Sequence, residues 1–169
     1  VTFGDAMSSG PEGKLNLTVS SEQLALTEVE IFMSANDIAK QLTLPIPLSA
    51  QGNVELFLSE MVIATGAQLS CSKAAGEVLW SRAGVVALEQ NIKLGKFMTE
   101  ISCDEGNLLA KVSPKNNLGL SFEGVLALAT QKVSGKGYLQ PGAKFPTQLK
   151  SALSFIGRPD NEGRYQLRF

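Results

Sequence analysis

Apolar and polar residues alternate with a period of two along most of this chain. The clearest stretch is 118–128, where apolar side chains stand at 118, 120, 122, 126 and 128 and mostly small or polar residues stand between them. A period of two places alternate side chains on opposite faces of a β-strand, so this pattern predicts a strand. Similar patterns predict strands at 15–19, 29–33, 54–58, 78–80, 97–103, 108–112, 133–139 and 165–169.

The spacing of these segments predicts an antiparallel meander. Asp104, Glu105, Gly106 and Asn107 separate two predicted strands, and residues of these types are typical of a hairpin turn. The apolar phase slips by one residue near 27–28 and again near 59–60. Such slips indicate β-bulges or sharply twisted strands.

Two short segments have helical patterns. The first begins at Asn36 and ends at Leu42, and Ser34 or Asn36 can cap its start. The second begins at Pro146 and ends at Ile156, before a glycine that can terminate it. Its apolar stripe, at 149, 152, 153 and 156, suits packing on a sheet. We therefore expect a mainly β fold: a strongly twisted antiparallel meander of about nine or ten strands, with two short helices packed on it.

Composition describes an ordered globular protein. Hydrophobic residues form 44% and charged residues 18% of 169 residues, and no linker-like segment divides them, so we expect a single domain over 1–169. A chain of this size usually buries about 70% of the surface of its unfolded form. The net charge is -1 and no dense basic run occurs, which argues against nucleic-acid binding. The start at Val1 has no initiator Met and no signal peptide, so we expect a fragment of a longer precursor.

The chain contains two cysteines, Cys71 and Cys103. They form no CxxC pair, and no histidine is present to complete a metal site. One interpretation is a disulfide, which would restrict the unfolded chain by about 3 to 4 kcal/mol in the chain-entropy model. The alternative is a pair of buried, reduced thiols.

The sequence offers little catalytic chemistry. It has no histidine, which removes the commonest general base and metal ligand. Ser70 and Lys73 match a Ser-x-x-Lys pattern, but the further elements of that enzyme class do not follow them. We expect an exposed turn serine and a surface lysine, and we predict no enzyme activity, no metal and no cofactor.

Apolar surface is the remaining candidate for function. The stretch 42–48 is hydrophobic and broken by prolines, which suits either a docking loop or a cover for the end of the sheet. Trp80 is expected to fill the core or to cover the disulfide rather than to anchor a binding partner. Together with the last predicted strand, this stretch forms the candidate interaction surface, which consists of Leu44, Ile46, Leu48, Tyr165, Leu167 and Phe169.

Several strings resemble the type II secretion system protein N family. They are the closing segment 149–169, with Phe155-Ile156-Gly157-Arg158-Pro159-Asp160 and Gly163-Arg164-Tyr165-Gln166-Leu167, and the segments 76–80 and 103–106 with the paired cysteines. The resemblance implies a non-catalytic accessory component of the bacterial type II secretion machinery. It also implies a place in the periplasm, anchored to the inner membrane by an N-terminal helix, with other secretion components of the inner membrane and periplasm as partners.

A second function stays open beside this one. Both alternate faces near the end of the 118–128 strand are rather apolar, which predicts a groove that could bind an apolar ligand such as a lipid. The family resembles β-rich envelope proteins of the AsmA type, which supports the same alternative. A disulfide would form and persist in the periplasm, so the cysteine hypothesis and the family resemblance agree.

Overall fold

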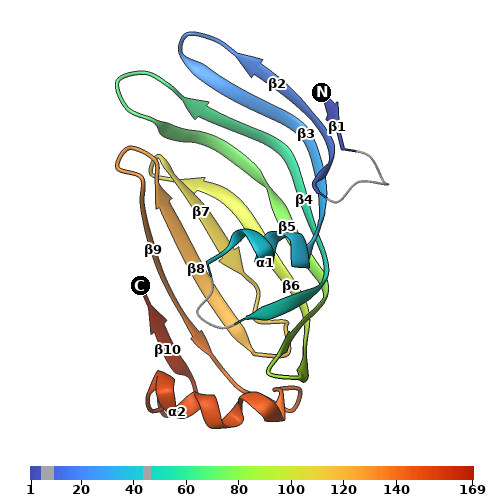
Figure 1. Ribbon diagram of the computed structural model, residues 1–169. Coiled ribbons are helices and arrows are strands. Elements are labelled where there is room, and N and C mark those ends of the chain that lie inside the picture. Colours follow the sequence, from blue (N-terminus) through green and yellow to red (C-terminus); the bar gives the residue numbers. More distant parts are fainter. Residues whose placement is uncertain (5–9, 44–46) are drawn as a thin grey trace.

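The structure is a computed structural model that describes residues 1–4, 10–43 and 47–169. Ten strands form one open antiparallel sheet in which every strand pairs with its neighbours in sequence (Figure 1). The predicted meander of nine or ten strands is confirmed. The strands are β1 (Thr2–Phe3), β2 (Glu12–Val19), β3 (Gln23–Ser34), β4 (Leu48–Ala64), β5 (Ser70–Ala87), β6 (Gln90–Asp104), β7 (Asn107–Val112), β8 (Leu120–Ala127), β9 (Lys132–Leu139) and β10 (Tyr165–Arg168).

The sheet has two different ends. At one end the strands are joined by short turns, such as the two residues Glu105 and Gly106 between β6 and β7. Both of these residues have positive φ, as tight hairpins of this length require, so the predicted turn is confirmed. The opposite end carries the longer connections and the helices, and α2 lies at that end beyond the strands (Figure 1). We call these the turn end and the helix end.

The first helix, α1 (Ala35–Gln41), agrees with the prediction within one residue at each end. The hydroxyl of Ser34 accepts a hydrogen bond from the backbone N–H of Asn36, which supplies the expected cap. The helix contacts β4 and β3, and Ala35 is buried. It packs on the sheet as expected.

The second helical segment differs in part from the prediction. It consists of a 3-10 helix, η1 (Thr147–Ala152), followed by one α-helical turn, α2 (Leu153–Ile156). Of the predicted stripe, Leu149 packs on the buried core and Leu153 is half-buried, but Ala152 and Ile156 are exposed. Phe155, outside the stripe, is 91% exposed. The predicted apolar stripe is therefore only partly used, because a segment this short brings little more than its first turn against the sheet.

The strand register separates apolar from charged residues across nine strands. Directly paired residues of an antiparallel sheet point to the same face, so each line of partners shares a face. One line from β2 to β10 is Gly13, Ile31, Leu56, Val78, Thr99, Val112, Phe122, Gly137 and Leu167. The neighbouring line, on the opposite face, is Lys14, Glu30, Phe57, Glu77, Glu100, Lys111, Glu123, Lys136 and Arg168. We call these the apolar face and the charged face.

Bulges keep the apolar face continuous along the strands. The pairing of β4 with β5 shifts between Leu58 and Glu60, and the pairing of β2 with β3 shifts between Lys14 and Asn16. At the second shift Glu28 of β3 has φ 49. An extra residue reverses the alternation of the strand beyond it. Because the sequence phase slips at the same two places, the apolar residues on either side of each slip share one face, and the predicted bulges are confirmed.

The buried core is small and lies toward the helix end. Its cluster consists of Ala83, Ile92, Leu94 and Phe97, and Leu149 of η1 packs against it. Trp80 also packs there, stacks on the Phe97 ring at 5.4 Å between centroids and donates a hydrogen bond from Nε1 to the Gln51 carbonyl. This agrees with the expected core position of Trp80.

The molecule exposes much more surface than its mass requires. Its accessible area is 10925 Å², whereas a compact protein of 18.0 kDa exposes about 8,000 Å². Relative to an unfolded chain, the fold buries about 58% of the surface rather than the expected 70% or so. A single curved sheet with one partly covered apolar face accounts for the difference.

Candidate interaction surface

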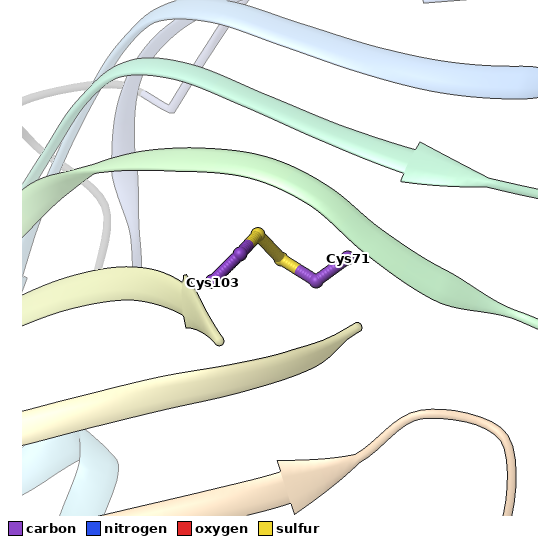
Figure 2. Close-up of a disulfide and its surroundings, with 2 residues drawn as sticks. All are labelled: Cys71 and Cys103. Carbon is purple, nitrogen blue, oxygen red and sulfur yellow. A yellow bond between two sulfur atoms is a disulfide. The ribbon is translucent and has the colours of Figure 1, made fainter. Parts of the chain in front are cut away.

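A disulfide joins Cys71 and Cys103 at the turn end (Figure 2). Cys71 begins the long strand β5, Cys103 lies near the end of β6, and their Cα atoms are 5.6 Å apart. The Cys71 amide also donates to the Gly106 carbonyl at 2.7 Å. The bridge therefore holds the β6–β7 hairpin against the start of β5. Of the two interpretations of the cysteines, the structure supports the disulfide.

The apolar face is poorly covered at the turn end. Leu17 and Val19 of β2 are 48% and 68% exposed, while Val133 of β9 and Phe169 after β10 are 61% and 69% exposed. Leu17, Val19 and Val133 each lie opposite a half-buried leucine of the neighbouring strand. Phe169 exchanges two backbone hydrogen bonds with Gly135 of β9. The described helical segments reach the apolar face at the helix end, through Leu149. The turn end thus presents an apolar strip that crosses the sheet.

Most of the charged face is an ordinary solvated surface, although Leu109, which pairs with Ser102 and Val125 on that face, is 7% exposed. Lys111 and Lys136 lie 3.7 and 4.0 Å from the Glu123 carboxylate, and all three side chains are partly exposed. Exposed ion pairs of this kind stabilise a protein by about 0 to 1 kcal/mol each. The contrast between the two faces makes the apolar face the better candidate for binding.

The predicted interaction residues fall into two groups that the fold keeps apart. Leu48 is half-buried at the start of β4, whereas Tyr165, Leu167 and Phe169 belong to the β10 segment, with strands β5 to β9 between them. Leu44 and Ile46 lie outside the described residues. Within the β10 group, Phe169 stacks on Phe122 of β8 at 5.4 Å between centroids. This group is continuous with the apolar face, so we retain it as part of the candidate surface.

Ser70 and Lys73 show no catalytic arrangement. The Lys73 ammonium forms an ion pair with the carboxylate of Glu60 on the neighbouring strand, and the side chain of Lys73 is 62% exposed. A lysine that activates a serine must instead lie next to it as a free amine and accept the proton of that hydroxyl. The expected interpretation of Lys73 as a surface lysine agrees with these contacts.

Among the described residues, the carboxylate that accepts the most hydrogen bonds is Asp160, in the turn before β10. Asp160 Oδ1 accepts hydrogen bonds from the backbone N–H groups of Glu162 at 2.9 Å and Arg164 at 3.0 Å. Its Oδ2 accepts from the Arg164 guanidinium at 3.0 Å. The backbone donor of Arg164 is the main reason that the pKa of Asp160 lies below its ordinary value. These bonds set the direction in which β10 enters the sheet, so the role of Asp160 is structural.

The sequence did not reveal how far the apolar surface extends, although the sequence pattern contains a signal for it. Short alternating segments were predicted, but β4 and β5 run for 17 and 18 residues and carry the apolar face to the turn end. The phase slips were the available clue, since without the bulges the apolar residues beyond them would point to the charged face.

Two absences among the described residues concern ions and membranes. Within 1–4, 10–43 and 47–169, no group of three or more His, Cys, Asp or Glu side chains is placed to hold a metal ion. In the same ranges, no helix combines the length and the hydropathy needed to span a bilayer.

Comparison with known proteins gives a consistent result. Residues 1–168 match the family model described as type II secretion system (T2SS), protein N. Similar relatives carry the name type II secretion system protein N: one from Vibrio cholerae is 27% identical over 98% of this chain, one from Klebsiella pneumoniae 27% over 87%, and one from Aeromonas hydrophila 28% over 75%. The matched regions cover 64%, 58% and 49% of those relatives, so the chain spans about half to two thirds of their length. No solved structure matches.

Proposed function

The chain belongs to the type II secretion system protein N family, and from that premise we propose that it is a non-catalytic accessory component of the secretion machinery. In this proposal, residues 1–169 act as one periplasmic domain that binds other proteins of the inner-membrane assembly. Contact with the membrane itself is assigned to a helix outside these residues, as the family resemblance implies.

The observation that carries the proposal is the partly covered apolar face. Exposed apolar patches on ordinary monomers reach a few hundred Å², and larger ones mark interaction sites. Here the total accessible area exceeds that of a compact protein of this mass by about a third. A partner that covered the turn end would remove that apolar surface from water and stabilise the assembly.

The disulfide supports the proposed compartment. Bridges of this kind form and persist in oxidising compartments such as the bacterial periplasm. The Cys71–Cys103 bond lies at the turn end, where it fixes the edge of the candidate surface. In the periplasm the disulfide would therefore persist and would hold the edge of the binding surface in place.

Crosslinking in cells tests this proposal. A photo-reactive residue at Val133 or at Phe169 samples the apolar face, and the same group at Glu100 samples the charged face as a control. We expect proteins of the secretion assembly to be captured from the first two positions and not from the third. Failure to capture them, with secretion unchanged when the gene is deleted, would refute the proposal.

The second candidate function is binding of an apolar ligand such as a lipid. The line of residues through Leu126 and Val133 and the line through Phe122 bring no charged side chain to the apolar face. A hydrocarbon chain has no polar groups to satisfy, so it suits a surface without hydrogen-bonding partners. Native mass spectrometry of gently purified protein would show bound lipid in this case, and Val133→Glu should release it. A protein that carries no lipid would remove this candidate.

A further inference from the structure

The outer edge of the sheet at β2 is only half occupied. β1 covers the first part of β2, with Thr2 opposite Lys14 and Phe3 opposite Gly13. Val1 and Leu15 exchange two backbone hydrogen bonds, of 2.7 and 2.9 Å. Beyond this point β2 continues from 16 to 19, and no strand of the described ranges pairs with its outer side.

The pattern of hydrogen bonds identifies the backbone groups that point outward. In an antiparallel strand, alternate residues direct both N–H and C=O toward the same neighbour. Leu15 bonds outward to Val1, whereas Ser20 bonds inward to Gln23. The N–H and C=O groups of Leu17 and Val19 therefore point away from β3, along the open edge.

Between residues 16 and 19 this edge carries no charged residue and no proline, two of the features that usually prevent strand pairing. Natural edge strands are protected by charged residues, proline, bulges or a covering loop. The residues here are Asn16, Leu17, Thr18 and Val19, and all four are exposed. Val and Thr favour strands, and Leu17 and Val19 also expose apolar side chains on the apolar face. The edge is suited to accept another strand.

We propose that β1 is the end of a longer strand, and that the segment preceding Val1 in the full-length polypeptide pairs with the open edge of β2. Val1 already lies in line with this edge, so the incoming segment needs no turn or linker. The matched regions cover 64% and 58% of two relatives, and the proposal assigns part of the remaining length to the N-terminal side of Val1. A second copy of the chain is a weaker occupant, because β1 already covers the adjacent part of the edge and would limit the pairing to about four residues.

The register of the added strand follows from that of β1. Since Val1 lies opposite Leu15, the residue two before Val1 would lie opposite Leu17, and the residue four before Val1 opposite Val19. Paired residues share a face. Those two positions should carry apolar side chains, and the added strand would extend the apolar face by one strand at the turn end. The pairing of the added strand with β2 does not depend on which partner the proposed function involves.

Cysteine crosslinking of the full-length protein tests the register. The pair of Thr18 with the residue three before Val1 would be a non-hydrogen-bonded pair, in which Cα atoms are about 4.5 Å apart, within disulfide range. We expect Thr18→Cys to crosslink within one polypeptide to a cysteine at that position. The control keeps Thr18→Cys and moves the second cysteine one residue further, where its side chain would point to the opposite face.

Amide exchange of the same full-length protein gives an independent result. The outward amides of Leu17 and Val19 should exchange at least tenfold more slowly than those of an unpaired edge, approaching the rate of the inward Thr18 amide. Fast exchange of Leu17 and Val19 beside a protected Thr18 would overturn the proposal. Crosslinks only between two polypeptides would overturn it too, and would assign the edge to a second copy.

Discussion

Trp80 and Phe97 are the two aromatic side chains on which the small core most depends. Phe97 is 9% exposed, stacks on Trp80 and belongs to the buried cluster. Only ten hydrophobic residues of the described ranges are buried, so little neighbouring structure can adjust to the loss of either ring. Stability should therefore respond strongly to single changes here and weakly elsewhere.

Phe97→Ala should lower the free energy of unfolding by about 3 to 5 kcal/mol, because it removes a buried ring and leaves a cavity. Urea denaturation followed by tryptophan fluorescence measures the change. Phe155→Ala is the matched control, since Phe155 is 91% exposed and should change stability by less than about 0.5 kcal/mol. Equal effects of the two substitutions would contradict the assignment of the core.

We predict that the Asp160 carboxylate stabilises the folded protein and that this contribution is lost in acid. Its pKa lies below the ordinary 3.8 because the Arg164 backbone N–H and further donors favour the carboxylate. A carboxyl whose pKa is lower in the folded state stabilises the fold above the ordinary pKa and loses that effect as the pH falls through the lowered value. Below about pH 4, the melting temperature of the wild type should therefore decrease more steeply than that of Asp160→Asn. Parallel melting curves for the two proteins across this range would count against the role of this carboxylate.

At the scale of elements, the bulges and the disulfide decide how the strands fit together. β3 and β4 each change phase at the same level of the sheet, so their apolar residues stay on the apolar face. The disulfide fixes β5 and β6 at the same end. Both features act on strand register rather than on the amount of buried surface.

Deletion of Ser59 should disrupt the sheet. Without the extra residue of β4, Met61 and Ile63 would turn to the charged face and Glu60 to the apolar face. We expect loss of cooperative unfolding or a destabilisation of more than about 4 kcal/mol, measured by thermal melting. Deletion of Gly66 in the β4–β5 turn is the control, because it leaves the phase of both strands unchanged, and it should be tolerated. A stable protein without Ser59 would show that register is not set at this bulge.

Reduction of the disulfide should lower the melting temperature by several degrees. The bridge spans 32 residues, which corresponds to about 3 to 4 kcal/mol in the chain-entropy model. Differential scanning calorimetry with and without reductant measures the shift. A protein carrying both Cys71→Ser and Cys103→Ser should melt at the temperature of the reduced wild type and show no response to reductant. Unchanged melting of the wild type on reduction would contradict the prediction.

The whole molecule is a curved, open sheet rather than a closed or two-layered one. The segment of η1 and α2 lies at the helix end (Figure 1). The apolar face continues to the turn end through pairs such as Leu126 with Val133. The large accessible area is the measurable consequence of this shape. Binding at the apolar face and pairing at the β2 edge would each bury part of that area.

The urea m-value of residues 1–169 should reflect the open shape. The m-value scales with the surface exposed on unfolding. With 10925 Å² already exposed in the folded state, unfolding exposes about 15% less surface than it does for a compact protein of this size. Equilibrium unfolding should therefore give an m-value about 15% below that of compact proteins of equal length. A value equal to theirs would indicate that the apolar face is covered in solution, for example by self-association, which sedimentation would detect.

The sequence by itself determined the strand order, the tight turn at Glu105 and Gly106, the bulges and the first helix. These depend on local chain geometry: a period of two assigns each side chain to a face, and a phase slip marks an inserted residue. It also supported the family assignment through the segments around 76–80 and 149–169.

Only the tertiary structure decided which part of the apolar face is covered. The exposure of Phe155, the pairing of Cys71 with Cys103, the separation of Leu48 from the β10 segment and the open edge at Leu17 and Val19 all depend on contacts between distant segments. The alternation in a strand is the same whether its apolar face meets a second layer, a partner or water. For that reason the pattern of residues identified the binding face of this protein but not how much of it the fold leaves open.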